Sequence, residues 1–166
     1  MGYVLFISEN KLKDSTAING NVSVEYLLPY VKVAQKKYCE TKLGTDLYEK
    51  LQADIIAGTL TGNYLTLVDD YIGDMLTHWA FYECIPFLRF KIQNGNIYSK
   101  TSETGQALSE SEASSLREEI RNTSEYYTQR LIDYLCNNNS LFPEYTTSSG
   151  ADVRPDKDNY FCGINL

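Results

Sequence analysis

The sequence predicts a mainly α-helical protein, organised as a small bundle of about four principal helices. Apolar residues in the stretch 63–94 recur at steps of three and four, which keeps them on one face of a helix. The segments 28–41 and 110–136 repeat that spacing. A β-like run at residues 3–7 is too short to form a sheet alone.

The segment 64–93 is predicted to be the central and most buried helix. Little of its circumference is polar in its second half, so other elements must cover it on several sides. Asn63 can cap its start, and Asn94 followed by Gly95 supplies a stop signal at its end. Its predicted core residues are Val68, Ile72, Met75 and Trp79.

Two shorter helices, 28–41 and 46–57, are predicted to meet at a tight corner. There Gly44 is expected to adopt a positive φ and Thr45 to cap the following helix. The first of these helices has a basic flank, and a run of this kind is more often a solvated helix face than a binding patch. Its lysines are Lys32, Lys36, Lys37 and Lys42.

The last predicted helix, 110–136, begins at a capping box. Ser109 precedes its first residue, and Glu112 follows at the position whose side chain bonds back to the cap. Acidic residues in this first turn also suit the helix dipole. The predicted core residues of this helix are Leu116, Ile120 and Leu131.

The chain therefore divides into an extended N-terminal arm (1–22), a helical domain (23–145) and an extended C-terminal tail (146–166). Within the domain, a polar stretch near 95–108 has the composition of a loop or hairpin. The tail begins with the composition of a tether and finishes with an apolar end. That end either packs on its own domain or, as we expect, docks on another subunit. Its apolar residues are Tyr160, Phe161, Ile164 and Leu166.

Charge and composition indicate a soluble protein made in a cytoplasm. A net charge of −7 and a pI near 4.7 argue against a nucleic-acid-binding surface over the whole chain. The N-terminus lacks the basic segment of a signal peptide, and charged residues interrupt every long apolar stretch. The four cysteines are widely spaced, which favours reduced and mostly buried thiols over a disulfide framework.

Tyrosine is unusually frequent, with 14 residues against 6 Phe and 1 Trp. Its side chain joins apolar area to a hydroxyl that can face water. It therefore suits both the edge of a core and a surface that is buried only after assembly. Both explanations stay open, and Tyr98 is a candidate assembly contact.

No group of residues indicates catalysis, a cofactor or a metal. His78 is the one histidine and has no matched nucleophile, so a packing or rim position is expected. Asp69, Asp70 and Asp74 resemble a carboxylate metal site only loosely, because Asp69 does not share the helix face of the other two. Phosphate-loop, dinucleotide-binding, zinc-protease and serine-hydrolase motifs are all missing.

Several short motifs follow one another in a specific order between residues 3 and 145. The most distinctive are the corner Leu43-Gly44-Thr45-Asp46-Leu47-Tyr48 and the closing Phe142-Pro143-Glu144-Tyr145. With the long aromatic helix between them, this order resembles the head–tail connector (adaptor) proteins of tailed bacteriophages. The closest resemblance is to those of crAss-like phages that infect Bacteroidetes.

The resemblance implies a structural virion protein with an α-helical protomer and no enzymatic activity. Copies would form a ring, usually of twelve, under the portal protein at the capsid vertex. Neighbouring connector or tail proteins would complete the stack, and genomic DNA would pass through the lumen without sequence-specific binding. The protein would act at the head–tail interface of the virion, after assembly in the host cytoplasm and without a membrane partner.

Two other functions remain open at this point. The first is a small helical adaptor or regulator that binds one partner, for example through residues 160–166. The second is a carboxylate-dependent metal enzyme that uses the three aspartates and His78 of the central helix.

Overall fold

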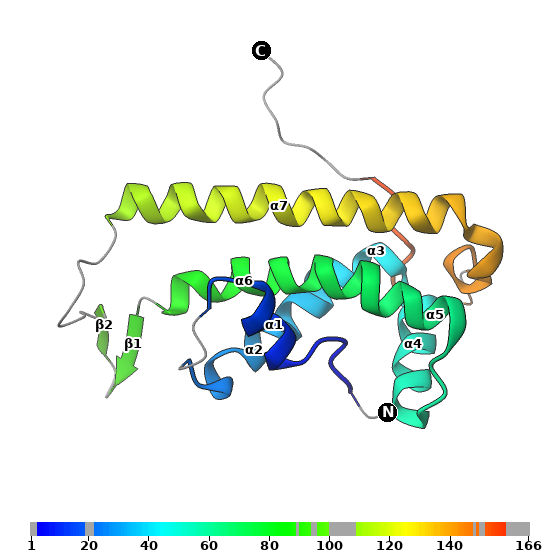
Figure 1. Cartoon of the computed structure of the whole chain (residues 1–166), viewed down its shortest axis with the longest axis horizontal. Helices are drawn as coiled ribbons and strands as arrows, with labels where there is room; N and C mark the ends of the chain where they lie inside the picture. The colour runs from blue at the N-terminus through cyan, green and yellow to red at the C-terminus, as the bar shows by residue number, and fades with distance from the viewer. Residues whose placement is uncertain are drawn as a thin grey trace, which may run out of the picture.

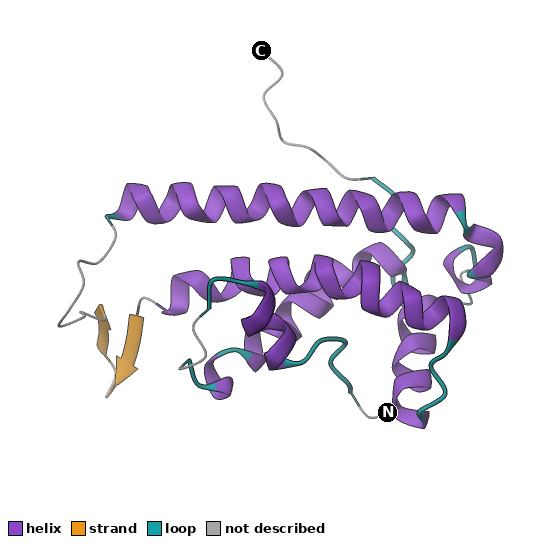
Figure 2. Cartoon of the chain, viewed as in Figure 1, coloured by secondary structure: helices purple, strands orange, loops and turns teal. Residues whose placement is uncertain are grey.

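The computed structural model describes residues 3–18, 22–88, 90–93, 96–99, 109–147, 149 and 152–158. The fold is mainly α-helical, as the sequence predicts, with one small hairpin (Figure 2). In this part of the chain, no helix is both long enough and apolar enough to cross a membrane.

The central helix is continuous from 62 to 88 and is built from α5 (Gly62–Thr66), a π-helical segment (Leu67–Ile72) and α6 (Gly73–Leu88). The long helix α7 (Glu110–Asn137) runs antiparallel along α6 (Figure 1). A capping box holds the start of α7, because Ser109 and Glu112 exchange side-chain-to-backbone hydrogen bonds as predicted.

The two shorter helices also lie close to their predicted positions. α2 (Leu28–Ala34), a π-helical segment (Gln35–Glu40) and α3 (Thr41–Leu43) form one helical stretch that packs against α6. Gly44 then turns the chain with φ of 76°, as expected, into α4 (Thr45–Ala57).

The prediction that the central helix continues to residue 93 is wrong. The helix ends at Leu88, and β1 (Phe90–Gln93) pairs antiparallel with β2 (Asn96–Ser99). Gln93 pairs with Asn96, so two residues connect the strands. The intervening Asn-Gly sequence is typical of such a hairpin, and this competing signal outweighed its role as a helix stop.

The extended N-terminal arm is also only partly correct. Residues Glu9–Ser15 form the helix α1, whose N-cap Ser8 accepts a hydrogen bond from the Lys11 amide. Leu12 is fully buried, and a short 3₁₀ turn, η1 (Val24–Tyr26), leads into α2. The helix forms because Leu12 packs into the core, since seven residues would be only marginally helical alone.

Six of the seven predicted core residues are buried. They are Trp79, Ile72, Val68, Met75, Ile120 and Leu131. The seventh prediction is wrong, because Leu116 is 44% exposed. The indole of Trp79 stacks on Tyr38 with 3.8 Å between ring centres, and its Nε1 donates to Thr128 Oγ1 at 2.9 Å. Trp79 therefore joins α6 to α7 and to the π-helical segment that follows α2.

Two 3₁₀ turns, Asn139–Leu141 and Pro143–Tyr145, follow α7 and bury Phe142 and Tyr145. Among the described cysteines, Cys39 and Cys84 are buried free thiols, while Cys136 is free and exposed. Burial raises the pKa of both buried thiols, that of Cys84 to about 12, so neither is a thiolate at neutral pH.

Candidate assembly surfaces

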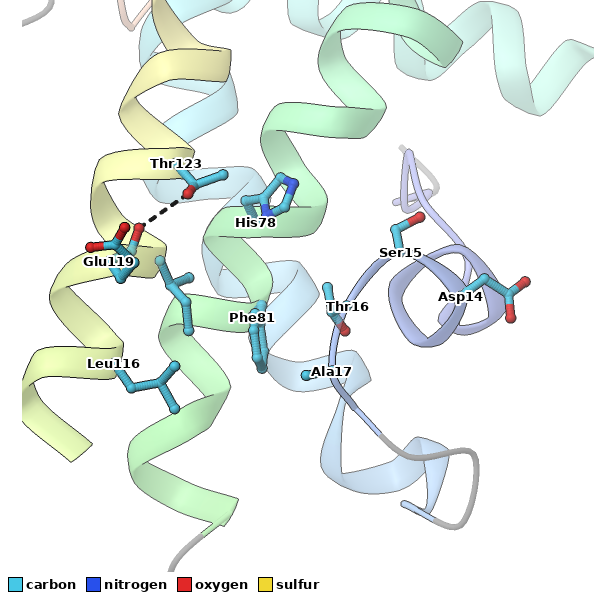
Figure 3. A pocket seen from close by; sticks show the side chains of 10 residues that line it. Asp14, Ser15, Thr16, Ala17, His78, Phe81, Leu116, Glu119 and Thr123 are labelled. Carbon is cyan, nitrogen blue, oxygen red and sulfur yellow. Dashed lines mark hydrogen bonds between the residues drawn. The ribbon is translucent and has the colours of Figure 1, made fainter. Parts of the chain in front are cut away.

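A groove lies between the end of α1, α6 and α7, and we refer to it as the α1–α6–α7 groove (Figure 3). It forms a hollow of about 430 Å³ that is open to solvent. Phe81, Leu116 and Ile120 supply its apolar floor. The charged residues along it are both acidic: Asp14 on α1 and Glu119 on α7, which lie on its two outer shoulders.

His78 belongs to the wall of this groove. Its ring stacks on Tyr127 with 4.9 Å between centres and 7° between planes. Burial lowers the pKa of the imidazole, and the nearby charge of Asp74 only partly opposes this effect. A neutral, stacked ring is the packing position expected from the sequence.

The loose carboxylate cluster is not assembled as a metal site. Across the described ranges, no group of three or more His, Cys, Asp or Glu residues lies close enough to hold a metal ion. Asp69 and Asp70 are exposed, and the Asp74 carboxylate lies 3.7 Å from the Lys11 ammonium. The Lys11 ammonium also donates to the Asp69 carbonyl at 2.8 Å, which attaches α1 to the π-helical segment.

A second surface lies on the outer side of α2 and the π-helical segment that follows it. Every exposed residue between positions 28 and 37 is apolar or a lysine, and none is acidic. These residues turn away from the buried side of the same helix, which carries Val31, Ala34 and Gln35. We refer to them together as the lysine face. Its members are Leu28, Pro29, Lys32, Val33, Lys36 and Lys37.

The lysine face is basic at its surface although two of its lysines have carboxylate partners. Lys36 pairs with Glu40 at 2.7 Å and Lys37 with Glu83 at 2.8 Å. The lysine side chains are 51% and 58% exposed, whereas both carboxylate side chains are only 13% exposed. The hydrogen bond to Glu83 also raises the pKa of Lys37. Positive charge is therefore presented to solvent, with the negative charge beneath it.

The two surfaces lie on opposite sides of α6. α1 and α2 both pack against this helix. In Figure 3 the groove opens towards the viewer, and the light-blue ribbon of α2 passes behind α6. One copy thus presents two surfaces of unlike chemistry in different directions.

The N-terminal residues are held by a slot made from two glutamine side chains. Gln52 Oε1 accepts from the Val4 amide at 2.8 Å, and its Nε2 donates to the Val4 carbonyl at 2.6 Å. Gln35 Oε1 accepts from the Phe6 amide at 2.8 Å, and its Nε2 donates to the same Val4 carbonyl at 2.9 Å. The side-chain amides thus replace the backbone of a neighbouring strand.

The described residues 147, 149 and 152–158 form a strap along the corner between α3 and α4, rather than the predicted free tether. The Thr45 amide donates to the Val153 carbonyl at 2.9 Å, and the Val153 amide donates to Thr45 Oγ1 at 2.9 Å. Thr45 therefore binds the strap instead of capping α4 as predicted. A Cβ at Gly44 would lie 2.5 Å from Cδ of Pro155, so the strap crosses where only glycine leaves room.

Charged and polar side chains complete the attachment of the strap. Asp46 accepts hydrogen bonds from the side chains of Thr147 and Ser149 and from the Ser149 amide. The ammonium of Lys42 lies 2.7 Å from the Asp156 carboxylate. These bonds lower the pKa of both carboxyl groups. Composition alone did not reveal this attachment, because the strap offers no apolar pattern.

The predicted assembly contacts are not among the side chains that the structure describes. Tyr98 belongs to β2, of which the structure describes the backbone. The apolar end of the tail is beyond the strap; its residues are Tyr160, Phe161, Ile164 and Leu166. The sequence did indicate the lysine face as a basic flank, but the α1–α6–α7 groove had no recognisable signal.

Comparison with known proteins gives one finding. A family model described as a family of unknown function (DUF6712) matches residues 39–155. No curated protein and no solved structure matches the chain. The matched segment reaches Pro155, so it includes most of the strap as well as the helices from Cys39 onward.

Proposed function

The chain belongs to the DUF6712 family of unknown function, and we propose that it is a structural virion protein, a subunit of a head-to-tail connector ring. The ring, of twelve copies in the proteins that the sequence resembles, would join the portal protein to neighbouring connector or tail proteins. Genomic DNA would pass through its lumen. The protein would act at the head–tail interface after assembly in the host cytoplasm.

The observation that carries this proposal is the pair of unlike surfaces on opposite sides of α6. A ring requires a heterologous contact, in which one patch binds a different patch on the next copy. The α1–α6–α7 groove and the lysine face meet this requirement, whereas a two-fold dimer needs a single self-complementary patch. The order of sequence motifs supports the same assignment independently.

The charge of the chain supports a role as a DNA conduit. A net charge of −7 gives the assembled ring an acidic surface. A lumen lined by lysine and arginine would bind phosphates and release counterions, which would slow the passage of DNA. An acidic ring leaves the duplex free to slide. The basic residues of the lysine face are consistent with this if they are covered by contacts between copies.

The apolar end of the tail adds a proposed contact with the adjacent ring. The strap fixes the chain at Asp156 on the corner, so the residues after it depart from a defined place on the protomer. Tyr160, Phe161, Ile164 and Leu166 would then reach a neighbouring subunit or connector protein. Many weak contacts of this kind around a ring add up.

The test is the assembly state of the purified full chain. We expect sedimentation velocity and negative-stain electron microscopy to show closed rings with a central opening. Immunogold labelling of virions should then place the protein at the head–tail junction. A monomer at all accessible concentrations would contradict the proposal and would favour the alternative of a small helical adaptor. A compact two-fold dimer would contradict it too.

A further inference from the structure

We propose that the lysine face of one copy binds in the α1–α6–α7 groove of the next copy. The inference rests on the proposed ring and specifies which surfaces form its repeated contact. The partner is therefore a second copy of this chain. The binding mode is a helix lying in a groove, with an apolar side chain inserted and charged side chains at the edges.

The apolar parts of the two surfaces are complementary. Val33 is 45% exposed on the lysine face and is flanked along the helix by Lys32 and Lys36. Leu116 is 44% exposed on the floor of the groove, beside Phe81 (Figure 3). The hollow of about 430 Å³ is large enough to receive side chains from one turn of a helix. Insertion of Val33 would remove both exposed aliphatic groups from water.

The charges are complementary in the same arrangement. Asp14 and Glu119 lie on the two shoulders of the groove, so a helix placed in it would have a carboxylate on each side. Lys32 and Lys36 are one helical turn apart on the same side of Val33, so their long side chains can reach one shoulder while their aliphatic parts cover the floor. Lys37 lies on the other side of Val33 and can reach the opposite shoulder. Complementary charge of this kind selects the partner and its register more than it adds affinity.

The negative net charge of the chain favours this pairing over contacts between two acidic surfaces. Copies with a net charge of −7 repel one another when acidic surfaces approach. The lysine face offers an exposed helical surface without an acidic residue among its exposed positions. An acidic surface of a neighbouring copy is therefore attracted to the lysine face, whereas it is repelled by acidic surfaces elsewhere on the chain.

The geometry also fixes the type of assembly. Because α6 separates the two surfaces, a copy cannot fill its own groove with its own lysine face. Each copy instead gives its lysine face to one neighbour and its groove to the other. Such contacts repeat in a head-to-tail manner and close into a ring when the rotation between copies allows it.

A covalent cross-link tests the pairing directly. Val33→Cys and Leu116→Cys are combined in one full-length chain, in a background in which Cys136 and Cys162 are replaced by serine. Mild oxidation of the assembled protein should give a ladder of covalent multimers on a denaturing gel. A variant with only one of the two introduced cysteines can form at most a dimer through it, because the remaining thiols of Cys39 and Cys84 are buried, so it is the matched control. A double-cysteine chain that gives no products beyond a dimer would overturn the pairing.

Charge reversal provides a second test that does not depend on oxidation. Lys32→Glu and Glu119→Lys should each weaken association at an interface about tenfold, because like charges then face one another across it. The chain that carries both changes should associate within about threefold of the wild type, because the charges are exchanged and complementary again. Sedimentation equilibrium at fixed salt measures the effect, and thermal unfolding verifies that each variant is folded.

The controls are Arg154→Glu and Asp70→Lys, which reverse exposed charges outside both surfaces. Neither should change association by more than about twofold, since isolated surface charges have little energetic effect. If rings form but the two test reversals behave like these controls, the pairing is wrong while the ring proposal stands. If both weaken assembly and the combination does not restore it, the two surfaces have different partners. A wild-type chain that never assembles contradicts the ring itself.

Discussion

The first and last described segments of the chain, the arm (residues 3–18) and the strap, both lie against the helical body, but different forces hold these two ends there. The arm buries Ile7, Leu12 and Ile18, and Gln35 and Gln52 bind its backbone. The strap buries none of its described residues fully, and it is held by polar bonds and an ion pair at an exposed corner. One end is therefore part of the core, and the other is attached to its surface.

This difference determines how each end should respond to perturbation. Apolar burial is not weakened by ionic screening or by moderate acid, and its loss affects the whole cooperative unit. Exposed ion pairs and hydrogen bonds are individually weak and are screened by solvent. Changes in the arm should accordingly destabilise the protein globally, whereas changes in the strap should release a local segment.

The largest effect is expected for Leu12→Ala. Leu12 is fully buried, so truncation removes apolar contacts and leaves a cavity. The free energy of unfolding should fall by about 2–5 kcal/mol, the range for such substitutions in cores. Urea denaturation followed by circular dichroism measures it. Asn10→Ala, at an exposed position of the same helix, is the control; equal small effects for both would mean that α1 is not part of the core.

Gln35→Leu should have the next largest effect. Gln35 is fully buried, and its amide bonds to the Phe6 amide, the Val4 carbonyl and the Tyr48 hydroxyl. Leucine keeps similar volume but leaves buried polar groups without partners, which costs about 1–3 kcal/mol. Hydrogen exchange at the Phe6 amide should accelerate along with global destabilisation. An unchanged Phe6 amide would contradict the role of Gln35 as a substitute strand.

The helices could be predicted from the sequence because their signals are local. Apolar spacing, Pro29 and the capping box at Ser109 each act within a few residues. The helix α1 was missed for the opposite reason, since Leu12 is its only buried residue and makes it stable through contacts with α6. Propensity alone did not distinguish this segment from a polar loop.

The candidate surfaces show the same limit more sharply. Leu116 has the helical register of a core residue, but α1 ends at Ser15 and leaves it exposed in the groove. The lysines were visible in the sequence, yet their position opposite an acidic groove depends on how helices pack around α6. The strap depends on bonds such as Val153 to Thr45, which are 108 residues apart.

Comparing Gly44→Ala with Gly58→Ala separates the effect of backbone strain at a positive φ from the effect of releasing the strap. Both glycines have positive φ, 76° and 68°, but only a Cβ at Gly44 would meet Pro155. Gly58→Ala should cost about 1 kcal/mol for its left-handed conformation. Gly44→Ala should cost about 1–3 kcal/mol, because its φ and ψ lie in a region that is nearly exclusive to glycine.

The distinguishing measurement is local. Limited proteolysis or hydrogen exchange should show that residues 152–158 become accessible in Gly44→Ala and stay protected in Gly58→Ala. If the strap is equally protected in both variants, its attachment does not require the absence of a side chain at position 44. If both release it, the strap responds to global stability and the contrast between the two ends is weaker than we infer.

The smallest effect is the release of the strap by acid. Hydrogen bonds from Ser149 and Thr147 lower the pKa of Asp46 below 3.8, and the bond from Lys42 lowers that of Asp156 below 3.8. A carboxyl group with a lowered pKa in the folded state stabilises that state fully above its ordinary pKa, and the contribution is lost as pH falls through the lowered value. The strap should therefore be unchanged between pH 7 and about pH 5, and it should detach only below pH 3.8.

The Ser149 amide, which donates a hydrogen bond to Asp46 at 3.0 Å, reports this detachment in an NMR titration. The Asp46→Asn substitution should abolish the acid transition of the Ser149 amide, because an amide side chain does not titrate in this range. The Phe6 amide, bound by the neutral Gln35, should show no transition over the same range unless the whole protein unfolds. A Ser149 transition at or above pH 3.8 would show that the strap does not favour the ionised carboxylate, and a simultaneous Phe6 transition would show that the two ends are released together.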